Sequence, residues 1–177
     1  MRQVYRLRKL GSLEGLHLET EPMPVLGTRD VLVRMRAWSL NFRDLMIMRN
    51  QYPLPLKPDL IPLSDGAGEV IEVGSAVTRF KSGDRVAANF HQRWVGGPSR
   101  REKMGSDLGG SIDGVLADHI VLGEEGCVRL PDYLSLEEGA TFPCAGLTAW
   151  SAVLAGTFSG HTGQRAVDSS PINVQNS

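Results

Sequence analysis

The chain has 177 residues, 41% of them hydrophobic, and its 19 basic side chains nearly balance 20 acidic ones. This length suits one domain or slightly more, and a net charge of −1 excludes the strongly basic surface of a typical nucleic-acid binder. No apolar run is long enough to span a bilayer and no signal-peptide core follows Met1, so we expect a cytoplasmic protein without membrane or nucleic-acid partners. Two cysteines cannot form a disulfide framework or a four-ligand zinc site, and Cys127 is predicted to be a small buried apolar residue.

Strand signals dominate the first 130 residues. Glycine and proline interrupt short apolar segments, which favours many short strands over long helices. In residues 31–37, Val31, Val33, Met35 and Ala37 fall on one face and Arg34 and Arg36 on the other, as in a half-buried strand. Residues 66–74 contain glycines typical of a bent strand with a close backbone neighbour. The predicted strands are residues 4–7, 16–20, 31–37, 66–74, 83–88, 114–122 and 127–130.

One short helix and two loops are predicted among these strands. Asn41, with Asp44 three residues later, predicts the N-cap of a helix over about residues 42–49. Four prolines make residues 52–62 an extended loop. Residues 89–110 form a long polar loop, and loops of this length are usually functional or disordered.

Helical signals begin at Ser135, which forms a capping box with Glu138. A further helix is predicted from residue 145 to an end at Gly156. The residues beyond it contain few apolar side chains and are predicted to be a disordered polar tail. The predicted organisation is a first domain over residues 1–131, bridging helices over 132–156 and the tail over 157–177.

Seven segments occur in an order that is found in a known family. They are residues 31–37, 41–44 (Asn-Phe-Arg-Asp), 62–70, 73–74, 80–86 (Phe-Lys-Ser-Gly-Asp-Arg-Val), 114–119 and 140–150. Together they resemble the GroES-like catalytic domain of the medium-chain dehydrogenase/reductase superfamily. The resemblance implies a mostly β fold, a partly open GroES-like barrel with short helices, here lacking the Rossmann domain that usually follows.

The resemblance also bears on metal binding. In the zinc alcohol dehydrogenases of this family, a Cys, a His and a second Cys hold a catalytic zinc. The matching positions here are Asn41, Ser64 and Cys144, and one thiol with an amide and a hydroxyl makes a poor zinc site. The chain therefore resembles the zinc-independent, quinone-oxidoreductase-like branch, and no metal is expected. Zinc held by Cys144, Asp65 and His91 is the alternative, although their spacing matches no ligand motif.

The activity implied by the resemblance is NAD(P)H-dependent hydride transfer to or from alcohols, carbonyls, enones or quinones. Without a metal, charge on the substrate oxygen must meet hydrogen-bond donors, and Asn41, Arg43 and Tyr52 are the candidate catalytic residues. Structural alternatives stay open for all three. Asn41 can be a helix N-cap, Tyr52 a ring packed on the proline-rich loop, and Arg43 the ion-pair partner of Asp65.

Further residues are expected in the cleft for substrate and cofactor. They are Ser64, Asp65, Cys144 and Thr148. Thr148 is expected near the nicotinamide, unless it bonds its own helix backbone. His91 and Trp94 either line a substrate entrance or are surface residues.

No glycine-rich cofactor turn is recognisable after residue 150. Residues 156–163 contain three glycines, but their spacing is not G-x-G-x-x-G and no apolar strand precedes them. NADPH or NADH is therefore the cofactor by resemblance only, with its binding domain absent, and this truncated chain is expected to be weakly active or inactive. The alternative is a non-catalytic GroES-like module that self-associates through the face that the absent domain would cover.

Overall fold

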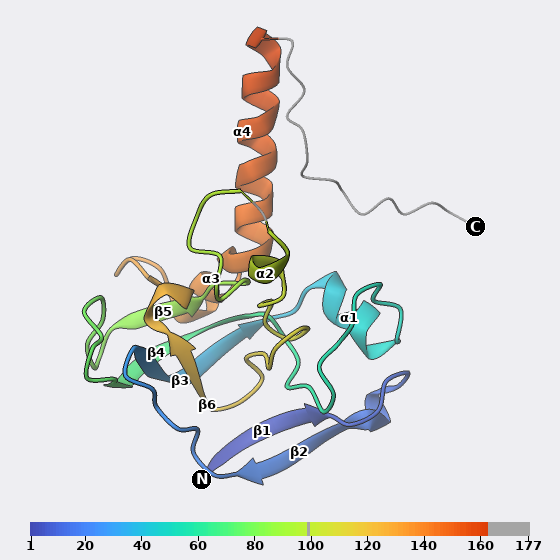
Figure 1. Ribbon diagram of the computed structural model, residues 1–177, viewed down its shortest axis with the longest axis vertical. Coiled ribbons are helices and arrows are strands. Elements are labelled where there is room, and N and C mark those ends of the chain that lie inside the picture. Colours follow the sequence, from blue (N-terminus) through green and yellow to red (C-terminus); the bar gives the residue numbers. More distant parts are fainter. Residues whose placement is uncertain (99, 163–177) are drawn as a thin grey trace.

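The strands form a curled half-barrel sheet with a separate hairpin, so the predicted mostly β, GroES-like fold is confirmed (Figure 1). The computed structural model describes residues 1–98 and 100–162. The sheet is antiparallel, with strand order β6-β3-β4-β5-β7. Its strands are β3 (Asp30–Ser39), β4 (Asp65–Val73), β5 (Arg85–Ala88), β6 (His119–Gly123) and β7 (Cys127–Arg129). The hairpin consists of β1 (Arg2–Leu7) and β2 (Leu16–Glu21).

Strand β3 shows why the sequence folds this way. Val33, Met35 and Ala37 are buried, whereas Arg34 and Arg36 between them are exposed and pair with Glu69 of β4. The alternation thus places the apolar side chains in the barrel and leaves the charges in water.

Glycines let β4 approach β3 closely, as predicted. A Cβ atom on Gly68 would lie 2.2 Å from the Arg34 carbonyl oxygen, and one on Gly66 would lie 2.5 Å from Cε of Met35. Side chains at these positions would push the two central strands apart.

The main core fills the inside of the barrel and includes Cys127, which is fully buried as predicted. Burial also raises the pKa of the Cys127 thiol to about 12. The other buried members are Val4, Val31, Val33, Met35, Ile61, Leu63, Val70, Phe80, Val86, Ala88, Leu108, Val115, Ala117, Ile120 and Leu122.

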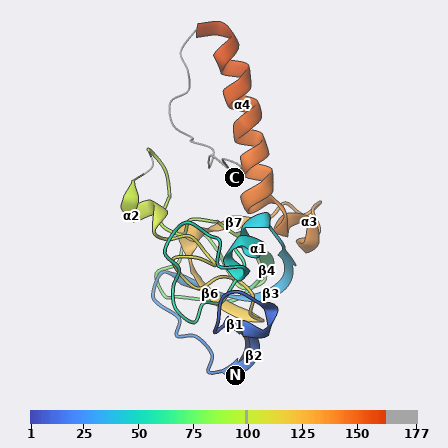
Figure 2. The ribbon, with the colours of Figure 1, turned by 90° about the vertical axis from the view of Figure 1, so that its right-hand side faces the viewer.

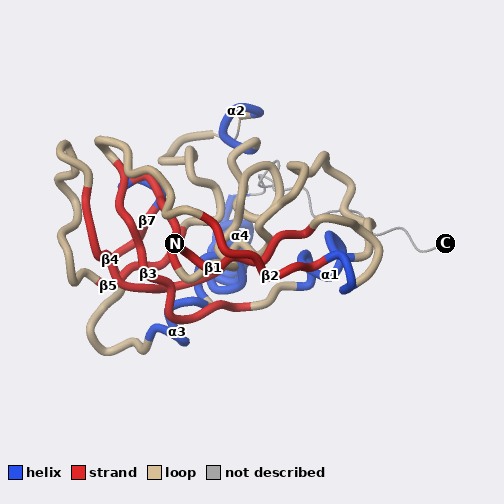
Figure 3. Tube along the Cα trace, turned by 90° about the horizontal axis from the view of Figure 1, so that it is seen from below, coloured by secondary structure: helices blue, strands red, loops and turns tan. Residues whose placement is uncertain are grey.

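The helices are short apart from the last one. They are α1 (Phe42–Met48), α2 (Arg101–Met104), α3 (Leu136–Ala140) and α4 (Leu147–Thr162), with 3₁₀ turns at Leu13–Gly15 and Glu124–Gly126 and a π-helical turn at Phe142–Gly146. Helix α1 lies at the opposite end of the barrel from β5 (Figures 1 and 3). Helix α4 projects away from the barrel (Figure 2). None of the helices in the described part of the chain is both long and apolar enough to cross a membrane.

Three parts of the predicted secondary structure were wrong: the start of one strand, the content of one loop and the end of the last helix. The strand predicted from residue 114 begins at His119, because residues 114–117 bond irregularly to both the 61–63 segment and β1. The loop over 89–110 contains α2. Helix α4 continues beyond Gly156 to Thr162, since an internal glycine costs a helix only about 1 kcal/mol and no proline follows before Pro171. The rest of the predicted tail, residues 163–177, lies outside the described residues.

Candidate functional site

The register of β3 and β4 assembles the candidate site. Ser39 at the end of β3 pairs with Asp65 at the start of β4, so Asn41 lies beside Asp65. Asn41 is the N-cap of α1, as predicted, and its backbone N–H donates to Oδ2 of Asp44 at 2.7 Å. The side-chain nitrogen of Asn41 is buried. Asn41 can therefore cap helix α1 and also belong to the candidate site.

Asp65 is fully buried and holds the site together. Its Oδ1 accepts the Ser64 hydroxyl at 2.9 Å, and its Oδ2 accepts the backbone N–H of Cys144 at 3.0 Å. Burial raises the pKa of Asp65, although the neighbouring Asn41 side chain and the hydrogen bonds from Ser64 and Cys144 act in the opposite direction. The carboxylate thereby joins β4 to the turn before α4.

Two further acidic groups share this environment. Asp44 is 7% exposed, and burial raises its pKa, with a smaller contribution of the same sign from Asp65. Burial and the Asp65 charge also raise the pKa of the half-buried Cys144 thiol. Arg43 opposes all three shifts, so it is the cation that compensates this acidic cluster.

Arg43 forms an ion pair with Asp107, and the structural alternative of a pair with Asp65 is not found among the described residues. Its Nη1 donates to the carbonyl oxygen of Leu108 at 3.0 Å. The Arg43 Cζ atom lies 4.8 Å from the ring centroids of both Tyr52 and Phe90. Tyr52 also packs against the apolar cluster around Leu60, which agrees with the structural interpretation of this residue.

Two of the remaining predicted residues, His91 and Trp94, line a further cavity. It measures about 390 Å³, and Pro143 and Leu147 are also among its lining residues. Burial lowers the pKa of His91, and its ring centroid lies 5.6 Å from that of Trp94. Thr148 is exposed in the first turn of α4.

Sequence reasoning missed Asp107 and Phe90. Both belong to the long loop over residues 89–110, and no local pattern pointed to their contact with Arg43. Leu63, directly before Ser64, was also missed. Its φ of 69° lies in the left-handed region, which costs a bulky residue roughly 1–2 kcal/mol.

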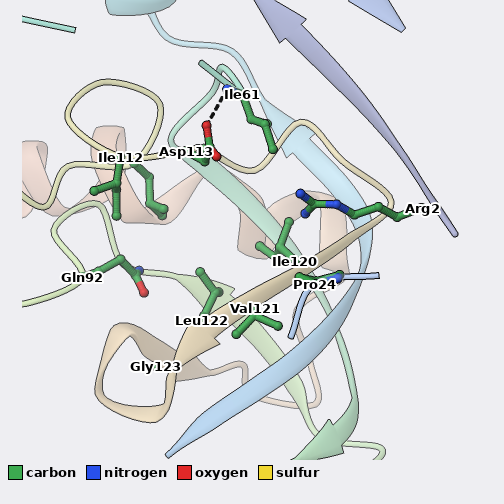
Figure 4. A pocket seen from close by; sticks show the side chains of 12 residues that line it. Arg2, Pro24, Ile61, Gln92, Ile112, Asp113, Ile120, Val121, Leu122 and Gly123 are labelled. Atoms are coloured by element: carbon green, nitrogen blue, oxygen red, sulfur yellow. Dashed lines mark hydrogen bonds between the residues drawn. The ribbon is translucent and has the colours of Figure 1, made fainter. Parts of the chain in front are cut away.

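A second cavity, of about 360 Å³, lies beside β6 (Figure 4). Several of its polar lining groups have protein partners, although the buried Nε of Arg2 has none among the described residues. Oδ1 of Asp113 accepts the Ile61 N–H at 2.9 Å, Arg2 pairs with Glu21, and the Gln92 amide donates to two backbone carbonyls. No predicted site residue lines this cavity.

Among residues 1–98 and 100–162, no group of three or more His, Cys, Asp or Glu side chains is placed to hold a metal ion. Cys144 and Asp65 lie together through the Cys144 N–H, while His91 lies in the cavity wall. The alternative zinc site on these three residues is thus not assembled in the described part of the chain.

Comparison with known proteins identifies close relatives. Residues 27–132 match the alcohol dehydrogenase GroES-like domain family. A zinc-type alcohol dehydrogenase-like protein of Schizosaccharomyces pombe is 42% identical over 135 residues, covering 76% of this chain and 39% of the relative. A chloroplast envelope quinone oxidoreductase homolog of Arabidopsis thaliana is 37% identical over 145 residues, covering 81% of this chain and 39% of the relative.

A solved structure shares the fold. The crystal structure of an NAD-dependent alcohol dehydrogenase matches with a TM-score of 0.73 at 33% identity, covering 88% of this chain and 48% of that chain. The chain spans about two fifths of the length of the two curated relatives.

Proposed function

The chain belongs to the alcohol dehydrogenase GroES-like domain family, and from this membership we propose that it supplies the substrate-binding part of an NAD(P)H-dependent oxidoreductase of the zinc-independent type. The substrates proposed are alcohols, carbonyls, enones or quinones. The nicotinamide cofactor supplies the hydride, and this chain's own residues bind and orient the substrate oxygen.

The residues at the family's zinc-ligand positions do not fit a zinc ion. The Ser64 hydroxyl donates a hydrogen bond to Asp65, and Asn41 offers an amide. Zinc takes up a thiolate, whereas burial and the Asp65 charge raise the pKa of Cys144 and favour the thiol. No step of the reaction is therefore assigned to a metal.

The buried Asn41 amide beside Asp65 is the observation that carries the proposal. A side-chain amide has two N–H donors, and the buried side-chain nitrogen of Asn41 has no hydrogen-bond partner among the described residues. It can therefore donate to a substrate oxygen as negative charge develops there. Such a fixed donor in a partly dry site is worth about 10²- to 10³-fold in rate.

The test is NADPH oxidation by the full chain with 1,4-naphthoquinone, an enone and an aldehyde. We expect Asn41→Ala to lower kcat/KM by about 10²-fold, and Asn41→Asp to lower it similarly because a carboxylate cannot donate. Ser75→Ala, at an exposed position after β4 with no role in the site, is the matched control and should change the rate little. Absence of oxidation with all three substrates, or full activity of Asn41→Ala, contradicts the proposal.

A second candidate function, association without catalysis, is favoured by one observation. Phe142, Leu147 and Trp150 are 50%, 60% and 63% exposed where α4 leaves the barrel. An apolar face of this kind favours a partner or a second copy. Size-exclusion chromatography at increasing concentration tests it. Association should weaken in Trp150→Glu, and a concentration-independent monomer contradicts it.

A further inference from the structure

Two stretches of the 89–110 loop form a small ladder, which we call the loop base and define as residues 90–93 and 106–108. The Leu108 N–H donates to the Phe90 carbonyl at 2.9 Å, and the Gln92 N–H donates to the Ser106 carbonyl at 3.1 Å. His91 and Asp107 form an isolated antiparallel bridge. The loop base also carries two residues, Phe90 and His91, that line the 390 Å³ cavity.

Arg43 of α1 joins the loop base to that helix. Three of the contacts of Arg43 come from the loop base: the Phe90 ring, the Asp107 carboxylate and the Leu108 carbonyl. The fourth, the Tyr52 ring, comes from the segment after α1. Since the guanidinium lies over two rings and forms a charged pair at its edge, both its plane and its direction are fixed.

The ion pair is shielded from solvent and closely packed. The side chains of Arg43 and Asp107 are 11% and 5% exposed, so water screens their attraction little. Gly110 makes room for them, because a Cβ atom there would lie 2.1 Å from both Nη2 of Arg43 and Oδ2 of Asp107. Ser111 donates its hydroxyl to the other carboxylate oxygen of Asp107.

We propose that Asp107 is a positioning residue. Paired with Arg43, it fixes the loop base against α1 and so holds Phe90 and His91 in the wall of the 390 Å³ cavity. Pro143 also lines that cavity, and its neighbour Cys144 is bonded to Asp65. That Asp107 affects substrate binding rests on the proposed function. That Asp107 fixes the loop base does not depend on it.

The first experiment needs neither cofactor nor substrate. The full chain is labelled with 5-fluorotryptophan, and Asp107→Ala is compared with wild type by ¹⁹F NMR, amide hydrogen exchange and limited trypsin digestion. The chain has three tryptophans, and the resonance of Trp94 is assigned with Trp94→Phe. Glu21→Gln, which breaks a comparable ion pair in the β1–β2 hairpin, is the matched control.

We expect Asp107→Ala to shift the Trp94 resonance, with Trp38 unchanged, and to speed exchange in the loop base and cleavage after Arg93 at least tenfold. Asp107→Glu should restore at least part of the protection, because the charge remains. Arg43→Lys keeps the charge but loses the flat stacking surface, and it should free the loop base as well. If Asp107→Ala changes these readouts no more than Glu21→Gln does, the proposal is overturned.

The second experiment tests the consequence for substrate. Asp107→Asn should raise KM for 1,4-naphthoquinone at least fivefold and leave kcat within about threefold, because Asn41 is untouched. A fall in kcat at unchanged KM contradicts the positioning role. If the wild type does not turn over, the proposed function fails, while the first experiment still decides whether Asp107 fixes the loop base.

Discussion

Two arginine–carboxylate clusters of this protein differ in what else holds their partners together. Arg2 and Arg6 pair with Glu21 across the β1–β2 hairpin, where a regular antiparallel ladder already fixes the two strands. Arg43 and Asp107 are 64 positions apart in sequence and belong to segments with no ladder between them. The first pair therefore adds to an existing ladder, whereas the second joins two segments that no ladder connects.

The largest effect is expected at the Arg43 cluster. Asp107→Ala leaves the guanidinium of Arg43 buried without its counter-charge, and this should lower the free energy of unfolding by about 3 kcal/mol. Urea denaturation of the full chain at pH 7 measures it. A loss no larger than that of Glu21→Gln would remove the distinction between the two clusters.

A steric change should disturb the same cluster without removing a charge. Gly110→Ala introduces a Cβ atom against both members of the pair and is expected to cost about 2 kcal/mol, seen as a lower Tm. Gly96→Ala is the matched control in the same loop, because nothing lies within 4 Å of its added Cβ. Equal melting temperatures of the two variants would show that the cluster tolerates rearrangement.

The hairpin cluster should show a smaller effect that depends on pH. Hydrogen bonds from Arg6 lower the pKa of Glu21 to about 2, against an ordinary value of 4.5. A lowered folded-state pKa contributes stability above pH 4.5 that is lost as the pH falls toward 2. Glu21→Gln should cost about 1 kcal/mol at pH 7 and progressively less below pH 4.5. Unfolding free energies of both proteins from pH 7 to pH 3 measure this, and a pH-independent difference contradicts it.

The smallest effect, of opposite sign, is expected at Asp44. Burial raises its pKa, so its contribution to stability is full at low pH and is lost as the pH rises through the raised value. Asp44→Asn keeps an oxygen for the Asn41 N–H and removes the buried charge. It should raise the unfolding free energy at pH 7 by less than about 1 kcal/mol, with the gain vanishing near pH 4. Destabilisation at pH 7 would show that the carboxylate is needed in its ionised form.

Much of the local structure could be predicted because its causes are local. The alternation in β3, the cap formed by Asn41 and Asp44, and the capping box of Ser135 and Glu138 each depend on residues within a few positions. The glycines of β4 likewise predicted a close neighbouring strand, which is β3. The end of α4 was misplaced since Gly156 alone is a weak stop signal.

The candidate site was predicted in part. The family resemblance brought Asn41, Ser64, Asp65 and Cys144 forward, and the structure places them together through the Ser39–Asp65 pair and the bond from Cys144. The sequence could not predict that Arg43 pairs with Asp107 and not with Asp65. The distance from Arg43 to Asp107 depends on the conformation of the loop over residues 89–110, which no local pattern determines.

By itself the sequence determined the strand-rich barrel, the helix starts and the residue types available at the family's zinc positions, because these depend on side-chain chemistry and short-range periodicity. Only the tertiary structure decided which carboxylate neutralises Arg43, that Phe90 and Tyr52 enclose its guanidinium, and that His91 and Trp94 line a cavity. Those outcomes depend on burial and on contacts between distant segments, and the strength of a charge pair is set by the water that the whole fold excludes.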